Sequence, residues 1–417
     1  MRDESATSTS PRWRDPKRYL WPLGLIIPLS PFLAWGLVSL LGPGAFWTLG
    51  LMIMGVALPL VDKFAGVDRS NPPDEAIAAL ENDKYYRWCV YLFLPLQYAG
   101  LVAACYLWAH GPLGVPERIG LAITVGIVGG VGINAAHELG HKRELRERWL
   151  SKVTLAQTLY GHFYVEHNHG HHLRVATPED PASAKFGESF WKFLPRTIVH
   201  GLRSAWELES RRLARQGMSR WTHKNHLFNA GAMSVLLFGV LIAVFGTVIV
   251  PYLLIQAAIA IVLYEAANYL EHYGLLRQKR SSGRYGKPTH RDSWNSDHLW
   301  SNLFLYHLQR HSDHHANPVR RYQALRTVDE SPQLPAGYAV MIFCALVPPL
   351  WRTVMDQRLI DFYDGDPDLV NVDRSDRRAV RKLEQLCAER ARAHSASVRP
   401  PQVRRSAPAG NGRSAAP

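Results

Sequence analysis

The chain has 417 residues, of which 47% are hydrophobic and 20% charged, and its 48 Lys and Arg against 35 Asp and Glu give a formal net charge of +13. This composition is too apolar for a disordered chain. The hydrophobic residues lie in long uncharged runs and the segments between them are strongly polar. A single soluble domain is therefore excluded.

Six runs are long enough to cross the hydrocarbon core of a bilayer, which is about 30 Å thick and takes roughly 20 helical residues. Turn segments at 42–44, 110–116 and 247–251 join them in three pairs. The sequence therefore predicts three helical hairpins in a membrane. The predicted runs are Tyr19–Leu41, Ala45–Val61, Tyr86–Ala109, Ile119–Ala136, Leu227–Val250 and Tyr252–Leu270.

Lysine and arginine are concentrated on the side of the spans opposite the hairpin turns, where only Arg118 lies close to a span. Positively charged loops remain in the cytoplasm, so we expect both termini and the long polar segments to lie there. The first apolar run is too long for a cleavable signal. The predicted division is 1–18 as a cytoplasmic N-terminal segment, 19–136 as spans one to four, 137–226 as a cytoplasmic histidine-rich region, 227–270 as spans five and six, 271–389 as a second cytoplasmic histidine-rich region and 390–417 as a disordered basic tail.

The tail combines Pro, Ser, Ala and Gly with six arginines and has no motif for stacking bases or reading a groove, so we expect no nucleic-acid partner. The four cysteines form no CxxC pair. No zinc ribbon, iron–sulfur or rubredoxin-type site is therefore built into this chain. Free thiols suit a reducing cytoplasm.

Nineteen histidines are many for this length, and nine of them gather in four short segments. Histidines four residues apart share a face of a helix, and imidazole is the commonest protein ligand for zinc, copper, iron and nickel. The segments lie at or beyond the polar ends of spans four and six, so we expect a metal centre just under the membrane with enough nitrogens for two ions. The nine are His137, His141, His167, His171, His172, His272, His311, His314 and His315.

The segment His137-Glu138-Leu139-Gly140-His141 taken alone also matches the HExxH signature of zinc proteases. Zinc takes three or four protein ligands, fewer than the nine histidines offer. This count favours two ions over a protease site, although an intramembrane zinc protease stays open as an alternative.

Polar residues accompany the ligand segments. Asn134, Glu265 and Asn268 lie within spans four and six, where polar groups are costly and are usually functional. We expect them to line the approach to the metals or to orient imidazoles, with hydrogen bonding between helices as the alternative. His307 lies four residues before His311, and we expect it to contact the ligand set from outside, with a role as a tenth ligand as the alternative. Four acids next to ligands are expected to accept hydrogen bonds from imidazole N–H groups: Glu138, Glu166, Glu271 and Asp313.

The pattern resembles the membrane-bound, histidine-rich di-iron superfamily of fatty acyl desaturases, hydroxylases and alkane and xylene monooxygenases, and within it the alkane monooxygenases. The string NYLEHYGLLRQ at 268–278 is the one that separates these from ordinary desaturases. The strings are HELGHK at 137–142, EHNHGHH at 166–172, ATPEDPAS at 176–183, NYLEHYGLLRQ at 268–278, SWNSDH at 293–298 and LQRHSDHHA at 308–316.

The resemblance implies an all-α, six-span membrane enzyme of the bacterial inner membrane, with a helical cytoplasmic domain in which the nine histidines hold two iron ions. It implies terminal hydroxylation of medium-chain alkanes with O2 and two electrons from rubredoxin, which a reductase renews from NADH or NADPH. Met54 in span two is a candidate limit on chain length. Desaturation or hydroxylation of a fatty acyl chain is the alternative within the superfamily.

Overall fold

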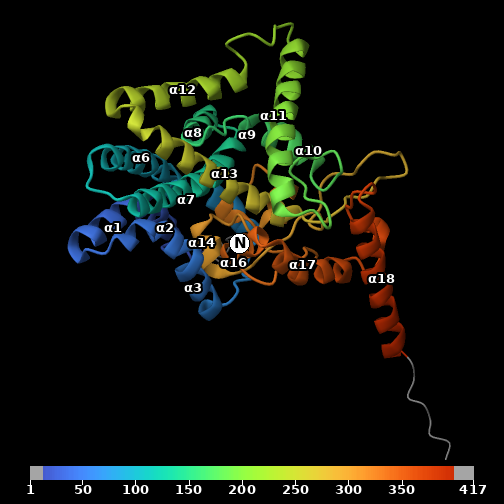
Figure 1. Cartoon of the computed structure of the whole chain (residues 1–417). Coiled ribbons are helices and arrows are strands. Elements are labelled where there is room, and N and C mark those ends of the chain that lie inside the picture. The colour runs from blue at the N-terminus through green and yellow to red at the C-terminus, as the bar shows by residue number, and fades with distance from the viewer. Residues whose placement is uncertain (1–12, 399–417) are drawn as a thin grey trace, which may run out of the picture.

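The computed structural model describes residues 13–398, and the regular secondary structure of those residues is helical, with a few isolated β-bridges (Figure 1). Six helical segments are long and apolar enough to span a membrane, which confirms the predicted number. They are Trp21–Leu41 (with α1, Ile26–Leu41), Gly44–Ala65 (with α2, Leu49–Met52, and α3, Leu58–Ala65), Lys84–His110 (α5, Lys84–Tyr91, and α6, Phe93–His110), Val115–Gly140 (α7), His226–Phe245 (α12) and Thr247–His272 (with α13, Val250–His272).

The predicted hairpins are present, and two of their turns place a glycine at positive φ, Gly42 at +90° and Gly246 at +80°. The fifth span ends at Phe245, five residues before the predicted end, because Gly246 takes φ +80°, a conformation that glycine adopts without strain. Pro251 then falls in the first turn of α13 instead of in the loop, where its missing N–H leaves no helical hydrogen bond unmade.

Spans four and six form the centre of the molecule. Most of α7 is buried, and a run of glycines on it faces α13. A β-carbon placed on Gly126 would lie 2.7 Å from Ile259, and one on Gly130 would lie 2.7 Å from Leu263. Small residues at such an interface let two helices approach closely. The close packing brings the polar ends of both spans, which carry His137 and His272, to the same place.

The polar segments form a helical layer across one end of the spans, around the histidine segments. The bounds there are α4 Asp74–Asn82, α8 Leu145–Ala156, α9 Phe163–Glu166, α10 His172–Arg174, α11 Phe190–Arg215, α14 Leu299–Phe304, α15 His311–Ala316, α16 Tyr338–Leu346, α17 Pro348–Phe362 and α18 Arg377–Val398. The helices α16 and α17 are bent by 120° at their junction. Helix α18 continues to Val398, so a helix occupies the first part of the segment from 390 for which we expected disorder, and the rest of that segment lies outside the described residues.

Candidate metal centre

The nine clustered histidines converge from four segments that lie far apart in the sequence. His137 and His141 come from the end of α7, three histidines come from 167–172, His272 ends α13, and three more come from α15. Their ring nitrogens form two groups, within each of which the candidate ligand atoms lie within 4.8 Å of one another. One group is His137, His141, His167, His172 and His314, and the other is His171, His272, His311 and His315.

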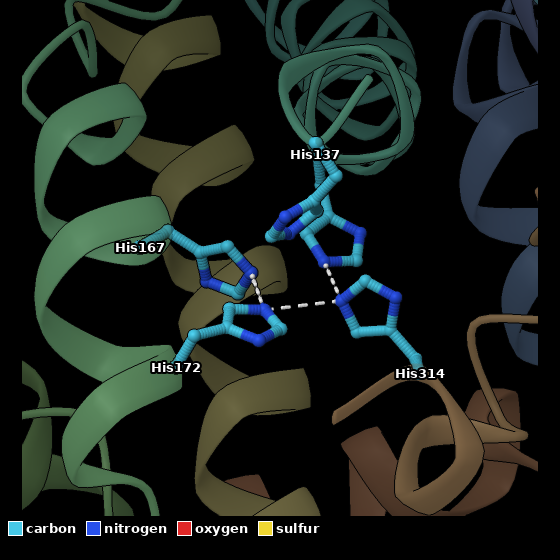
Figure 2. Close-up of side chains that lie close together, drawn as sticks. His137, His167, His172 and His314 are labelled. Carbon is cyan, nitrogen blue, oxygen red and sulfur yellow. Dashed lines mark hydrogen bonds between the residues drawn. The ribbon is translucent and has the colours of Figure 1, made fainter. Parts of the chain in front are cut away.

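Four histidines of the five-histidine group, His137, His167, His172 and His314, point their Nε2 atoms toward one another (Figure 2). The Nε2 atom of His314 lies 2.8 Å from that of His137 and 3.1 Å from that of His172, which in turn lies 3.0 Å from that of His167. Divalent zinc binds imidazole nitrogen at about 2.1 Å, so two ligands at a right angle lie about 3.0 Å apart. These separations therefore fit nitrogens that share one metal ion.

The four-histidine group shows the same fit. The Nε2 atoms of His311 and His315 lie 3.0 Å apart. Those of His171 and His272 are buried without a hydrogen-bond partner in the described part of the chain. A buried nitrogen without a partner is costly, and a metal ion removes that cost.

Each His-His pair supplies one ligand to each group. His171 and His172 belong to different groups, and so do His314 and His315. The two groups are in direct contact, because the rings of His172 and His315 lie 4.3 Å apart between centroids. Two candidate metal positions that lie side by side, with histidine rings in contact between them, are the arrangement of a dinuclear centre.

The second histidine segment differs locally from the expected helix. From the sequence we expected His167 and His171 to share one face of an α-helix. Residues His167–His171 instead form a π-helical turn. This turn widens the helix so that residues five apart line up. His167 is therefore paired with His172, while His171 turns to the other group.

Burial favours the neutral form of an imidazole, which is the form that binds a metal. Burial lowers the pKa of six histidines outside the spans well below 6.5, and neighbouring imidazoles lower the pKa further. These are His141, His167, His172, His311, His314 and His315.

Two oxygen atoms fix the orientation of histidines in the smaller group. The Nδ1 atom of His171 lies 2.8 Å from the Asp180 carboxylate, and that of His272 lies 3.2 Å from the main-chain carbonyl of Asp292. An acceptor at Nδ1 holds the proton there and leaves the lone pair on Nε2 free for a metal. Sequence reasoning assigned no role to Asp180, although it lies in the ATPEDPAS string, and a buried acid shortly after a ligand pair was the available signal.

Three of the four flanking acids do not have the expected partners. Glu138 pairs with Lys142 at 3.0 Å, Glu166 with Arg174 at 2.6 Å and Asp313 with Arg320 at 2.7 Å. In a helix, successive side chains point about 100° apart, so an acid beside a ligand faces away from the metal position. Glu271 is the exception, because its Oε2 atom lies 3.2 Å from Nε2 of His311.

The polar residues within the spans lie close to the centre. Asn134 donates to the carbonyl of Leu305 at 2.7 Å, which ties α7 to the end of α14. Glu265 accepts from Tyr160 at 2.7 Å and from Asn268 at 3.0 Å, and both Glu265 and Asn268 line a small cavity that also reaches His167 and His171.

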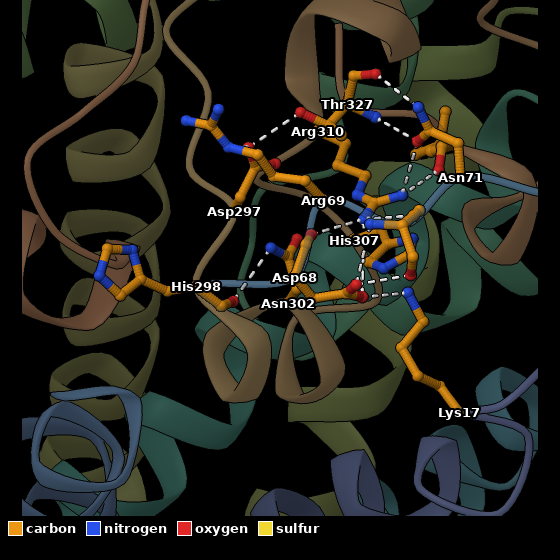
Figure 3. Close-up of polar contacts among 12 residues, drawn as sticks. Lys17, Asp68, Arg69, Asn71, Asp297, His298, Asn302, His307, Arg310 and Thr327 are labelled. Carbon is orange, nitrogen blue, oxygen red and sulfur yellow. Dashed lines mark hydrogen bonds and ion pairs between the residues drawn. The ribbon is translucent and has the colours of Figure 1, made fainter. Parts of the chain in front are cut away.

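His307 is not brought into the cluster. Its Nδ1 atom lies 2.9 Å from the carbonyl of Tyr322, and its ring packs edge-on against Trp21. Close to it, buried Arg310 donates to the carbonyls of Asp68 and Leu325 at 3.0 Å and 2.8 Å, and Lys17 holds the Asp68 carboxylate (Figure 3). This network fixes the start of α15 from the side opposite the histidines.

Met54 is buried in a second π-helical turn, Ile53–Ala57, in span two. It lines an apolar crevice between spans two, four and six and α16, and Asn134, one turn before His137, lines the same crevice. The other lining residues are Gly130, Val131, Leu263, Tyr264, Ala267, Leu305, Leu308, Tyr338 and Ile342.

Fold and site together define a class: a multi-pass helical membrane protein with buried clusters of histidine that could bind metal ions. A family model described as fatty acid desaturase matches residues 117–345, a range that contains all nine histidines. The chain therefore belongs to the fatty acid desaturase family, and the following relatives place it among the alkane 1-monooxygenases within that family.

The alkane 1-monooxygenase of Ectopseudomonas oleovorans is 43% identical over 374 residues, which are 90% of this chain and 93% of the relative. Alkane 1-monooxygenase 1 of Alcanivorax borkumensis is 43% identical over 86% of this chain and 89% of the relative. The alkane 1-monooxygenase of Acinetobacter baylyi is 44% identical over 86% of this chain and 88% of the relative. The chain is thus an oxidoreductase of the monooxygenase type, and the zinc-protease alternative is wrong.

Proposed function

We propose that this enzyme hydroxylates the terminal methyl group of medium-chain n-alkanes to a primary alcohol, with O2 and with two electrons from reduced rubredoxin, at a centre of two iron ions. The observation that carries the proposal is the arrangement of nine imidazoles in adjacent groups of five and four beside an apolar crevice. The overall reaction is R–CH3 + O2 + 2e⁻ + 2H⁺ → R–CH2OH + H2O.

The nine histidines are the proposed iron ligands, with one ion held by each group. Bound iron supplies the reduction of O2 and the oxidation of a C–H bond. The protein orients the imidazoles through Asp180 and the Asp292 carbonyl, and it surrounds the ions with buried side chains that exclude water. Glu271 adds a carboxylate beside His311 that is available to an ion or to a proton.

The apolar crevice is the proposed seat of the alkane end. An alkane offers no polar group, so its affinity comes from burial, at about 0.8 kcal/mol per methylene. Lipid-facing spans surround the crevice, and its lining continues to Asn134 beside the metal centre, so a chain that enters from the bilayer presents its methyl end to the ions. Met54 is proposed to limit how far the chain extends.

The proposed location is the bacterial inner membrane, with both termini and the metal centre on the cytoplasmic side. The positive-inside bias supports this orientation, because the basic residues lie on the histidine side of the spans and a rubredoxin there is reduced from NADH or NADPH. The segments 1–18, 19–136, 137–226, 227–270, 271–389 and 390–417 stay the proposed division of the chain.

The test combines metal analysis with product analysis on the purified membrane enzyme. Two irons per chain, and 1-octanol from octane only when rubredoxin, its reductase and NADH are all present, are the expected results. A single zinc per chain would refute the di-iron centre. Modification of a fatty acyl chain without any alcohol from octane would favour the acyl-chain alternative.

A further inference from the structure

The segment 277–291, here called the basic loop, lies between α13 and α14. It contains several cationic residues and no acidic residue. It turns back on itself: Lys279 and Tyr285 form a β-bridge, Arg280 donates its N–H to the carbonyl of Arg284 at 2.9 Å, and Gly283 takes φ +75° at the turn. The loop is therefore an ordered projection that carries a dense positive charge.

The charge of the basic loop is not neutralised within the protein. Lys279, Arg280, Arg284 and Lys287 are exposed, and none of them forms an ion pair with any residue between 13 and 395. An unpaired cationic surface attracts an acidic partner over about a Debye length.

Both ends of the basic loop are attached to the metal-ligand segments. At its start, Arg277 donates to the carbonyl of Leu173, the residue after His172, at 2.7 Å. At its end, the Asp292 carbonyl lies 3.2 Å from Nδ1 of His272. A partner bound to the loop is thus connected to the His272 imidazole by a short stretch of main chain and one hydrogen bond.

The position of the loop favours a water-soluble partner over the lipid surface. In Figure 1 the loop that follows α13 projects on the side of α11 and α18, away from the hairpin that joins α6 to α7 and from α1 and α2. The spans extend in the opposite direction from the metal centre.

We propose that the basic loop is the docking surface for an acidic electron-carrier protein, and that electrons enter the centre on the His272 side, through the four-histidine group. This inference rests on the proposed function, since the monooxygenase reaction consumes two electrons that the chain has no motif to supply. Each one-electron carrier is oxidised once, so two docking events serve each alcohol formed.

The test is the double variant Arg280→Glu and Lys287→Glu in the full-length enzyme, with Arg377→Glu and Arg381→Glu on α18 as the matched control. Both pairs are exposed and without ion pairs among the described residues, and both change the charge by the same amount. Octane hydroxylation is measured against the concentration of reduced rubredoxin, at several salt concentrations. It is measured again with reduced methyl viologen, a small donor that needs no docking surface.

For the loop variant we expect kcat/KM for rubredoxin to fall about tenfold or more and to lose its salt dependence, while the viologen-driven rate stays unchanged. The control variant should behave as wild type. An unchanged kcat/KM in the loop variant, or a loss in the control alone, would overturn the proposal. So would a loss seen only in nanodiscs of anionic lipid and absent in zwitterionic lipid, because it would assign the loop to the membrane surface. Failure of the wild type to form alcohol with either donor would instead refute the proposed function.

Discussion

The hydrogen bond between Asp180 and His171 gives the sharpest test of how the protein prepares the metal centre. The Asp180 carboxylate accepts from Nδ1–H of His171 at 2.8 Å and from the hydroxyl of Ser183 at 2.6 Å, and all of these groups are buried. Burial alone would raise the pKa of Asp180, but the interactions of its carboxylate with His171 and with the Ser183 hydroxyl lower the pKa to about 2. The carboxylate is therefore a permanent acceptor at working pH.

Asp180→Asn keeps the shape of this side chain but makes one of its two terminal atoms a donor. If the amide N–H faces Nδ1, the imidazole of His171 must carry its proton on Nε2, the nitrogen that lies with the four-histidine group. That tautomer has no lone pair for a metal. Loss of such an orienting partner lowers metal affinity about 10–100-fold, which corresponds to about 1.4–2.7 kcal/mol.

The assay is a chelator titration of the purified iron-loaded enzyme, with iron content and octane turnover followed together. We expect Asp180→Asn to lose one iron at about 10–100-fold lower chelator concentration than wild type while the second iron is retained longer. The control is Glu179→Gln, which changes the neighbouring residue. Glu179 lines a separate cavity at the surface, and its substitution should not change the titration. Equal chelator resistance in Asp180→Asn and wild type would refute the orienting role.

Further predictions follow from the same geometry. His314→Ala should abolish turnover and reduce bound iron, because it removes a nitrogen that lies within 3.1 Å of two others, whereas exposed His223→Ala should change neither in metal and activity assays. Met54→Ala should extend the accepted alkanes by one or more methylenes, measured as alcohols from a mixture of chain lengths, and an unchanged product range would remove Met54 from the crevice wall. The iron-free enzyme should lose thermal stability as the pH falls below about 6.5. Six histidines have a lowered pKa in the folded chain, so as the pH falls they bind protons in the unfolded chain first. Each of them lowers the free energy of unfolding by up to about 1.4 kcal/mol per pH unit. A melting temperature that is constant between pH 7 and 5.5 would contradict that account.

The spans and the gathering of histidines were accessible from the sequence because both depend on local patterns. A run of about 20 apolar residues has few alternatives to a membrane helix. Imidazoles repeated at helical spacing have few alternatives to a metal site. The number of spans and the helical class were therefore predicted correctly, with differences at the ends, as at Gly246, where one residue with a positive φ ended the helix early.

The partners of the ligands were not accessible in the same way. Sequence proximity suggested Glu138, Glu166 and Asp313 as acceptors, but neighbours on a helix point in different directions, and these acids pair with cations. The observed acceptors, Asp180 and the Asp292 carbonyl, come from irregular segments whose course depends on tertiary packing.

The division of the histidines into two groups also depends on backbone geometry that spacing alone does not determine. An ideal α-helix would place His167 above His171, whereas the π-helical turn places it above His172. His171 and His172 therefore belong to different groups. His314 and His315 of α15 are also divided between the two groups. One segment can therefore contribute to both metal positions and fix the distance between them. A substitution that restores a regular helix at 167–171 would thus disturb both positions at once, whereas loss of His272 removes a ligand from only one.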